Sequence, residues 1–581
     1  MRKILVLLLL LIAHDTLFAQ TSVTARVLDA GNRMPLPYAT VLLKGTTRGT
    51  ITNFDGWFSL PLQSDRDSLR ISFVGYRTLI IPFGPQLNGS HILLERAVQE
   101  LGEAVIRPGE DLYTRVVAAS NWLRRSPEVT SKLFYGMETH SDDQPVEVLQ
   151  GYYSATYKAA MLTSLRFKKG RIGIAPKSDR HFINFNTARA FALMDIHAER
   201  GHYPLSPLSF TAPKKLKKAF YAELISSGTG PDAVDHIRVQ ARDSTRGTFA
   251  LDLWLVAGGE QVRSLELSCE NCRKHPFVPL FPQGRIDSVD MRYKQTWTIT
   301  APFIPEVMEL EYNTAYTGPD LNDRFHTHAI MHAFDHGNEF IPTLFKWRSG
   351  LEEYRMISWL PDDSVFWSRM TPPLPTERQL RDQAFIAEHD LRKNQWYDSL
   401  SVHWDLLMPV YKNWSATDRL NFWEITGIWS PKSWQPPDPN KVELYAQLYL
   451  DMDTTNGGLH WTSTAVFDPR NSVYMAEPQP WTEVFLRMYF DLCEIQRRKM
   501  EAELRRSDIT VELARKIYEQ HSRQLRNTLD TFMKHTRNGR DGSSLIPWNE
   551  KIAKELNIRN LTLELWPMEH VLDKPILIDP R

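Results

Sequence analysis

Four histidines lie within sixteen residues of the segment FHTHAIMHAFDHGNEF, which runs from Phe325 to Phe340. Imidazole is the commonest metal ligand among protein side chains. In a strand every second residue shares a face, so His326 and His328 would lie about 6.6 Å apart, close enough to bind one ion. His332 would lie about 13 Å further along, and His336 as far again. The spacing therefore predicts at most a two-histidine half-site, with zinc as its metal.

Two other interpretations of this run remain open. A helix ending at Gly337 would place His328, His332 and His336 in one row, of which only neighbours could share an ion. Alternatively, a half-exposed strand carries the histidines on its solvent side with no metal at all. His336-Gly-Asn-Glu339 also spells the H-x-x-E of some zinc peptidases, but no catalytic framework of such enzymes surrounds it.

The chain has three cysteines, two of them in Cys269-x-x-Cys272-x-x-His275. A zinc site here would need a distant fourth ligand. A redox pair should open a helix, but the strand-like RSLELS runs into this motif and Pro276 follows it. We therefore expect Cys269 and Cys272 to form a disulfide that closes a turn. Cys493, on an apolar helix face, is expected to be a buried free thiol.

Local motifs of catalysis are missing from the sequence. It has no H-E-x-x-H, no G-x-S-x-G, no Walker A loop and no G-x-G-x-x-G after a strand. The loop DPRNSVYMAEPQPW, residues 468–481, is polar and aromatic, which suits either a polar ligand or a long entrance to a helix. These observations favour a non-catalytic protein.

The N-terminus has the pattern of an export signal. The basic start Met1-Arg2-Lys3 precedes the apolar run Ile4–Ala13, and Ala19 is a suitable residue for cleavage. The run is shorter than the roughly 20 apolar residues that span a bilayer. No cysteine follows it to carry a lipid. Residues 1–19 are therefore predicted to be a signal peptide.

Composition indicates a folded protein rather than a disordered one. Of 581 residues, 42% are hydrophobic and 24% are charged, which is typical of globular domains. Lys plus Arg equals Asp plus Glu at 69 each, so no net field favours nucleic acid. Seventeen Trp and twenty Tyr suit β-rich cores or a glycan ligand.

Residues 20–106 read as short strands separated by turns, the pattern of a small β-sandwich. Asn53 and Asp55 are expected to cap backbone amides in one turn. The stretch resembles the carboxypeptidase-like regulatory domain, a transthyretin-like sandwich. The resemblance rests on Val27–Asp29, Pro35–Val41, Lys44–Thr46, Gly49–Phe58 and Ser72–Tyr76, and Ala25 departs from it because a Gly is usual there.

This resemblance implies an interaction or folding module without catalytic residues of its own. Such modules follow signal peptides in exported proteins of Gram-negative bacteria, often as an N-terminal extension of TonB-dependent outer-membrane receptors.

The rest of the chain divides into two regions. Residues 107–349 show one amphipathic helix from about Leu112 and then alternating strands, which predicts a β-rich domain. Residues 350–581 contain the Pro-rich boundary MTPPLPTE at 370–377 and then a charged amphipathic helix over about 376–400. A strand pair around the turn TTNGG and two long helices follow. The fold class is therefore α+β and multi-domain: a transthyretin-like β-sandwich, a β-rich middle domain and a mainly helical C-terminal region with a β-hairpin.

These patterns predict an exported, non-catalytic interaction or scaffold protein of the periplasm or outer-membrane periphery of a Gram-negative bacterium. Its expected partner is a protein or glycan of the cell envelope; peripheral membrane association is compatible with the sequence, and nucleic acid is not expected. No cofactor is required. The alternatives are a metal-dependent hydrolase that uses zinc at His326 and His328, and a glycan-binding protein that uses the aromatic residues.

Overall fold

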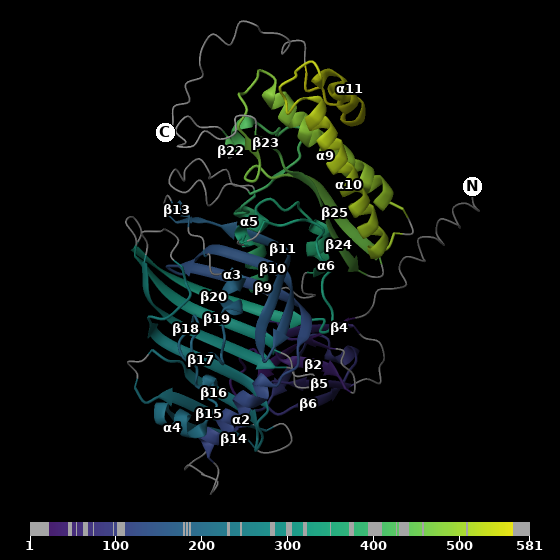
Figure 1. Ribbon diagram of the computed structural model, residues 1–581. Coiled ribbons are helices and arrows are strands. Elements are labelled where there is room, and N and C mark those ends of the chain that lie inside the picture. The colour runs from purple at the N-terminus through teal and green to yellow at the C-terminus, as the bar shows by residue number, and fades with distance from the viewer. Residues whose placement is uncertain are drawn as a thin grey trace, which may run out of the picture. The chain divides into compact units, whose positions relative to one another are not determined.

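The computed structural model describes residues 22–561 apart from 45–48, 54, 62–67, 74, 97, 101–110, 178–179, 182–183, 185–186, 229–232, 244–246, 279–284, 298–304, 318–321, 349, 352, 371–376, 393–409, 426, 429–440, 456–457 and 507–508. The expected signal peptide at 1–19 lies outside the described residues. The chain forms two compact units (Figure 1). The first comprises Met1–Glu339 and Met370–Lys393, and the second comprises Phe340–Arg369 and Asn394–Arg581.

The N-terminal part of the first unit is a β-sandwich, as predicted. In one sheet β1 (Ser22–Asp29) lies between β4 (Trp57–Pro61) and β7 (Ser90–Leu94). The other sheet has the order β3-β2-β5-β6. Its strands are β2 (Thr40–Leu43), β3 (Gly49–Ile51), β5 (Ser68–Ser72) and β6 (Leu79–Pro82), and η1 (Pro85–Leu87) follows. Alternate apolar residues of both sheets form one buried core.

The turn before β4 requires both its polar residue and its glycine. The Asn53 side-chain oxygen accepts hydrogen bonds from the amides of Asp55 (3.0 Å) and Trp57 (2.8 Å). Gly56 has a φ of 78°, and a Cβ there would lie 2.5 Å from the Val27 carbonyl oxygen. The expected capping by Asn53 is confirmed, and glycine is the residue that fits this close backbone approach.

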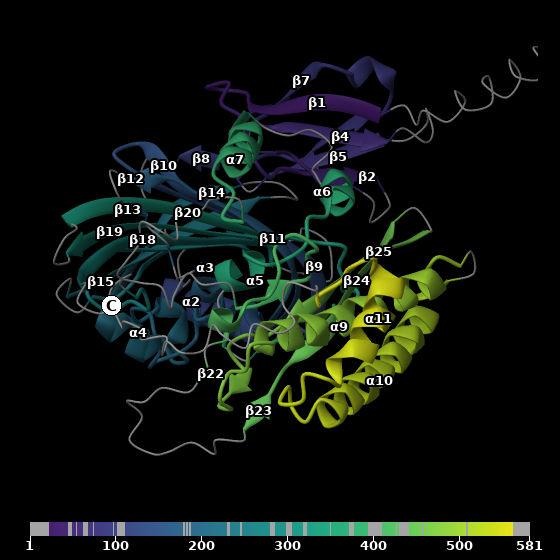
Figure 2. The same cartoon turned by 90° about the horizontal axis from the view of Figure 1, so that it is seen from above.

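An antiparallel sheet of eleven strands dominates the first unit (Figures 1 and 2). Its order is β11-β10-β9-β20-β19-β18-β17-β16-β15-β14-β8, so β20 returns to pair with β9. The bounds are β8 (Val98–Glu100), β9 (Val129–Ser141), β10 (Gln144–Lys158), β11 (Met161–Ile174), β14 (Phe220–Gly228), β15 (Val234–Ala241), β16 (Ala250–Val256), β17 (Val262–Cys272), β18 (Arg285–Trp297), β19 (Pro305–Thr317) and β20 (Asn322–Phe334).

Helices cover one side of this sheet, which we call the inner face. They are α2 (Leu112–Arg124), α3 (Thr187–Ala192) and α4 (Pro213–Ala219). Arg115 of α2 forms a buried ion pair with Asp235 of β15 at 2.8 Å, and Phe191 of α3 packs edge-on against Tyr135 of β9. The predicted helix after residue 110 is confirmed by α2. The short elements β12 (Pro176–Lys177), β13 (Arg180–His181) and η2 (Pro207–Ser209) complete this region.

The opposite side of the sheet, the outer face, carries α7 (Glu377–Glu388). A Cβ on Gly173 of β11 would lie 2.8 Å from the Ile386 Cα, so the helix lies close to the strand backbone. The sequence predicted this charged helix over about 376–400, and its second half lies outside the described residues. Residues 370–393 thus belong to the first unit, although the division expected from the sequence was a single one after residue 349.

In the second unit, a hairpin packs against a helical pair. The hairpin is β24 (Ala446–Thr455) and β25 (Gly458–Phe467), extended by β21 (Lys412–Asn413), and the helices are α9 (Thr482–Leu504) and α10 (Val511–His535). The hairpin and both helices appear where the sequence predicted them. The other elements are α5 (Glu353–Ile357), α6 (Ser364–Met370), η5 (Phe422–Glu424), β22 (Gly427–Ile428), β23 (Val442–Glu443), β26 (Val473–Tyr474) and α11 (Leu545–Leu556).

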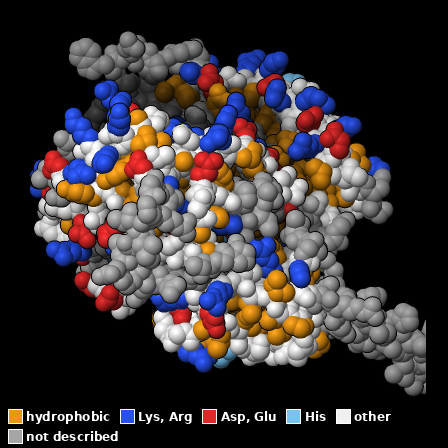
Figure 3. Space-filling model, turned by 90° about the horizontal axis from the view of Figure 1, so that it is seen from below, with side chains coloured by type: hydrophobic (Ala, Val, Ile, Leu, Met, Phe, Trp, Pro, Cys, Tyr) orange, Lys and Arg blue, Asp and Glu red, His pale blue; other side chains and the backbone are white. Residues whose placement is uncertain are grey.

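Charges of both signs are interspersed over the face of the molecule that Figure 3 shows, in keeping with the balanced composition. Within the described ranges, no helix combines the length and the apolar character needed to cross a bilayer.

Candidate functional site

The histidine run is a strand. His326, His328 and His332 of β20 are half-buried on the outer face, and they alternate with buried residues such as Thr327 and Met331 on the inner face. His336 lies in the turn after the strand, where its Nδ1 is 2.9 Å from the Ser131 hydroxyl. The alternation expected for a strand is confirmed, and the helical interpretation is wrong.

Each histidine of the expected metal pair has partners of its own. His326 Nδ1 lies 2.7 Å from the Asn313 side-chain oxygen, and its Nε2 lies 3.5 Å from Glu311. His328 Nε2 lies 3.6 Å from Glu309 on the same neighbouring strand, β19. The two imidazoles therefore face different carboxylates rather than one common point.

No group of three or more His, Cys, Asp or Glu side chains in the described part of the chain is arranged to bind a metal ion. Zinc at His326 and His328 stays a prediction. Glu339, the acidic residue of the H-x-x-E sequence, lies 2.7 Å from Arg166 in an ion pair. Burial lowers the pKa of His332 to about 4, with the charge of His336 acting in the same direction, so the His332 ring is neutral at pH 7.

Sequence reasoning missed the residues opposite this pair. The register of β9 and β20 places His140 opposite His326 and Glu138 opposite His328. Glu138 pairs with His140 at 2.9 Å and with Arg378 of α7 at 2.7 Å. Burial tends to raise the pKa of Glu138, but the hydrogen bond from His140 and the charge of Arg378 outweigh it and lower the pKa. The outer face thus holds an ionised carboxylate beside the Arg378 guanidinium group.

Ion pairs continue across the outer face toward β15. Lys294 lies 3.8 Å from Glu309, Arg292 lies 3.2 Å from Glu266, and Arg238 lies 2.9 Å from Asp252. Lys294 and Arg238 lie directly opposite their partners on neighbouring antiparallel strands, and Arg292 reaches its partner diagonally. This pairing accounts for the charge of the outer face without a ligand.

On the inner face of the same strands lies a buried polar row around Glu147 of β10. The Asn184 amide donates to both carboxyl oxygens of Glu147 at 3.2 and 3.1 Å, and the Thr139 hydroxyl donates at 3.5 Å. The Thr139 and Thr327 hydroxyls are 3.1 Å apart, and Asn184 also donates to Tyr312. Burial raises the pKa of Glu147 to about 8 against these hydrogen bonds, so the carboxyl group is protonated at neutral pH.

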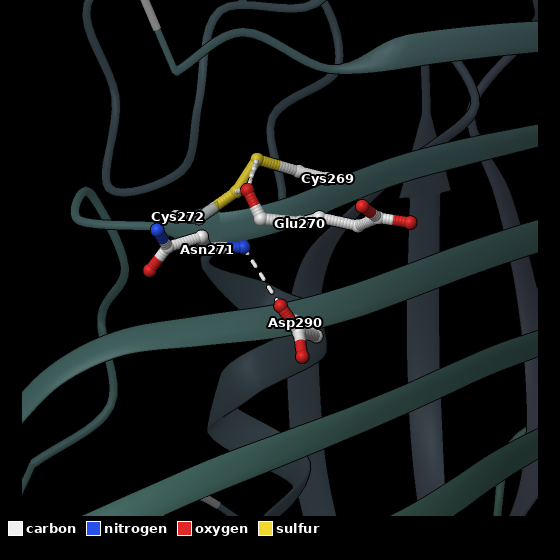
Figure 4. Close-up of a disulfide and its surroundings, with 5 residues drawn as sticks. All are labelled: Cys269, Glu270, Asn271, Cys272 and Asp290. Carbon is white, nitrogen blue, oxygen red and sulfur yellow. Dashed lines mark hydrogen bonds between the residues drawn. A yellow bond between two sulfur atoms is a disulfide. The ribbon is translucent and has the colours of Figure 1, made fainter. Parts of the chain in front are cut away.

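Cys269 and Cys272 are joined by a disulfide at the end of β17 (Figure 4). Between them Asn271 has a φ of 52°, and its amide donates to the Asp290 carboxylate of β18 at 2.7 Å. The bond therefore closes a tight turn, the arrangement expected from the sequence. Cys493 is free and buried, as predicted, and burial raises the pKa of its thiol.

The segment after the disulfide reaches the buried polar row. Phe277 stacks on His275 with ring centres 5.7 Å apart, and on Tyr312 of β19 with ring centres 4.2 Å apart. Burial lowers the pKa of His275. His275 thus packs against the Phe277 ring, although the motif suggested it as a third zinc ligand.

Polar side chains of the loop 468–481 bond largely within the loop. The Asn471 side chain donates to Asp468 at 2.6 Å, and the Ser472 hydroxyl donates to the Asp468 carbonyl oxygen at 2.7 Å. Tyr474 is buried and lies near the Thr482 hydroxyl at the start of α9. These contacts suit the expected role as an entrance to a helix, while a ligand for this loop stays a prediction.

Residues 23–106 match the family described as the CarboxypepD_reg-like domain. The N-terminal sandwich is therefore a carboxypeptidase-like regulatory domain, as the sequence predicted. Curated relatives match over the N-terminal segment, about a fifth of this chain. The chain is 34% identical over 108 residues to the TonB-dependent receptor SusC of Bacteroides thetaiotaomicron, which covers 18% of this chain and 10% of the receptor. It is 33% identical over 117 residues to the TonB-dependent receptor P39 of Formosa agariphila, and this match covers 20% of this chain and 11% of the receptor. The chain thus spans about a tenth of the length of these relatives.

Solved structures give distant likenesses. A LolA superfamily protein of Nitrosomonas europaea is 8% identical, with a TM-score of 0.18, and the match covers 40% of this chain and 96% of that one. A DUF1329 family protein of Desulfovibrio piger is also 8% identical, with a TM-score of 0.17, and the match covers 42% and 93%.

Proposed function

We propose that the protein is an exported, non-catalytic interaction or scaffold protein at the periphery of the Gram-negative cell envelope. The observation that carries the proposal is the N-terminal regulatory domain, which this chain shares with TonB-dependent receptors while the remainder of the chain differs from theirs. A module that is joined to different domains in different chains is better suited to binding than to one particular reaction.

The contacts of the titratable side chains support the same proposal. On the outer face Glu138, Glu309 and Glu311 each have a basic partner, and on the inner face the carboxyl group of Glu147 is held by an amide and a hydroxyl. Perturbed pKa values arise in structural networks as well as in active sites. Glu138, Glu309 and Glu147, whose pKa values are shifted, each have partners that give them a structural role.

Export is tested by producing the full chain with its own leader in a Gram-negative host. We expect the protein in the envelope fraction, with a mature N-terminus at Gln20. A matched variant without residues 1–19 should stay in the cytoplasm. Retention of the full chain in the cytoplasm would contradict the proposal.

The binding role is tested with a photo-crosslinking residue on the regulatory domain. Met34 and Ile80 are exposed apolar side chains of the sandwich, at 61% and 50%, and a crosslinker at either should capture one defined envelope protein in living cells. Tyr221 and Val278, which are 57% and 55% exposed on the large-sheet domain, are the matched control positions. Equal capture at all four positions, or none at any, would count against a binding role for the domain.

A further inference from the structure

Helix α4 concentrates positive charge in a chain whose total charge is balanced. Four of its seven residues are lysines: Lys214, Lys215, Lys217 and Lys218. All four are exposed, while Leu216 between them is buried and fixes the helix on the domain. The helix lies against α2 and β14, near the edge of the large sheet that is opposite to β11 (Figures 1 and 2).

An arginine and a tyrosine widen this charged surface. The Arg242 guanidinium carbon lies 3.6 Å from the centre of the Tyr221 ring, and its Nε donates to the Lys217 carbonyl oxygen at 2.8 Å. Lys217 Nζ lies 5.7 Å from the centre of the Tyr113 ring of α2. Contacts with ring faces and a backbone oxygen orient the cations without neutralising them. We call the exposed members of this group the basic patch: Lys214, Lys215, Lys217, Lys218, Tyr221 and Arg242.

Nearby acidic residues do not neutralise the basic patch. Among the carboxylates that the structure describes, none forms an ion pair with its lysines or its arginine. Asp243 follows Arg242 in the chain, and Glu223 of β14 lies opposite Arg238 in the strand register rather than beside a lysine. The basic patch therefore keeps an excess of positive charge.

The stability of α4 does not account for its lysines. Lys214 and Lys218 are four residues apart, Lys215 and Lys218 are three apart, and like charges at these spacings destabilise a helix. Cations in the first turn also oppose the helix dipole, and the favourable position of Lys217 and Lys218 in the last turn offsets only part of this cost. A negatively charged partner would explain why the four charges are kept together.

We propose that the basic patch docks on the anionic headgroups of a lipid bilayer. Lysines clustered on one exposed helix face are attracted to a negatively charged bilayer surface. An ammonium group on a flexible stem binds phosphate as a point charge, which suits a fluid layer of headgroups. The exposed ring of Tyr221 beside them suits the boundary between headgroups and water. The inference rests on the proposed function, since it gives a protein at the cell envelope its contact with the membrane.

Flotation with lipid vesicles tests the docking. The chain is used from Gln20 onward, because the apolar run Ile4–Ala13 would itself bind lipid. We expect binding to vesicles of phosphatidylglycerol mixed with phosphatidylcholine, and no binding to vesicles of phosphatidylcholine alone. Binding should weaken as salt is raised, because salt screens charges at a surface. The measurement uses purified protein, so its failure is distinguishable from a failure of export or of crosslinking in cells.

The double variant Lys214→Gln with Lys218→Gln assigns the binding to the basic patch. A lysine near an anionic surface contributes about five-fold to the partition coefficient, so the loss of two should weaken binding about 25-fold. Glutamine has a helix propensity similar to that of lysine, which preserves α4. The matched control is Lys534→Gln with Lys554→Gln, because both lysines are exposed on helices of the second unit and their loss changes the net charge equally. The control should bind as the unaltered chain does.

Several results would overturn the proposal. They are an absence of binding to the anionic vesicles at low salt, equal binding to phosphatidylcholine alone, and an equal loss in both double variants, which would indicate a response to net charge. A duplex DNA fragment bound as tightly as the anionic vesicles would also overturn it, because the basic patch would then recognise any polyanion. If the α4 double variant fails to fold, Arg242→Gln replaces it, with an expected loss of about five-fold, and an unchanged affinity there contradicts the proposal.

Discussion

Glu138 and Glu147 are held on opposite faces of the same pair of strands, β9 and β10, and the two environments give their carboxyl groups different charges. On the outer face, His140 and Arg378 outweigh burial and lower the pKa of Glu138. On the inner face, burial dominates the neutral donors Asn184 and Thr139 and raises the pKa of Glu147 to about 8. The presence of cationic partners decides which of the two carboxyl groups is ionised.

This contrast shows how a sheet accommodates polar residues on both sides. A carboxylate that lacks a cationic partner can be buried once it is neutral, since the cost of desolvation falls on the charged form. A half-buried carboxylate with a cationic partner keeps its charge and can bind a neighbouring segment, as Glu138 binds Arg378 of α7. At neutral pH the inner face therefore holds an uncharged carboxyl group, while the outer face holds a charged one.

The largest expected effect comes from Glu147→Gln. In the folded protein the pKa of Glu147 is raised from 4.5 to about 8, so the folded state holds a proton that the unfolded chain releases. Stability of the wild type therefore decreases as pH rises between these two values. Glutamine does not ionise, so the variant should gain about 3–5 kcal/mol relative to the wild type between pH 4 and pH 8. Urea unfolding at a series of pH values measures this difference.

Glu138→Gln is the control for that series, because folding lowers the pKa of Glu138 and raises that of Glu147. Parallel stability curves for the wild type and Glu147→Gln would show that the carboxyl group ionises without penalty. The inner face would then be wetter than its burial indicates, and the contrast between the two faces would be lost.

Much of the fold follows from the sequence, because it depends on local patterns. Turn residues such as Asn53 and Gly56 mark the sandwich, and the apolar stripes of α2 and α10 mark helices. Around His328 the sequence left a strand and a helix open, and the structure shows the strand. The sites depend instead on pairings between distant residues. Thr139 and Thr327 lie 188 positions apart in the sequence and their hydroxyls are in contact, and Arg378 of α7 pairs with Glu138. A single sequence contains no information on that register, so the residues opposite the histidines and the neutral state of Glu147 could not be predicted.

Removing the disulfide tests whether this bond stabilises the end of β17, which lies close to the buried polar row. Cys269 lies opposite Met291 of β18, whose other neighbour is Tyr312 of the polar row. Replacing both Cys269 and Cys272 by serine opens a loop with a sequence separation of 3. A short loop of this kind contributes about 2 kcal/mol in the chain-entropy model, and unfolding by urea under non-reducing conditions measures it. A loss equal in the presence and absence of reductant would contradict the role of the bond.

A smaller effect is expected on the outer face for Glu138→Gln. The pKa of Glu138 is lowered in the folded state. The stability that Glu138 contributes is therefore present above the ordinary carboxyl pKa, and it disappears as the pH falls through the pKa of the folded protein. The variant should lose about 1–2 kcal/mol at pH 7, the size of a charge-assisted hydrogen bond near the surface, and the loss should close in acid. A loss that persists unchanged in acid would mean that packing, and not charge, holds Glu138.

The smallest effect is expected when zinc is added to the protein. His326 and His328 face Glu311 and Glu309 separately, at 3.5 and 3.6 Å, so binding one ion requires both imidazoles to leave these partners. After incubation with one equivalent of zinc and desalting, we expect elemental analysis to show far less than one zinc per chain, and His326→Ala with His328→Ala to leave that value unchanged. Stoichiometric zinc that is lost in the double variant would instead support the metal-dependent hydrolase. The metal would then replace Arg378 of α7 as a partner of the His328 ring.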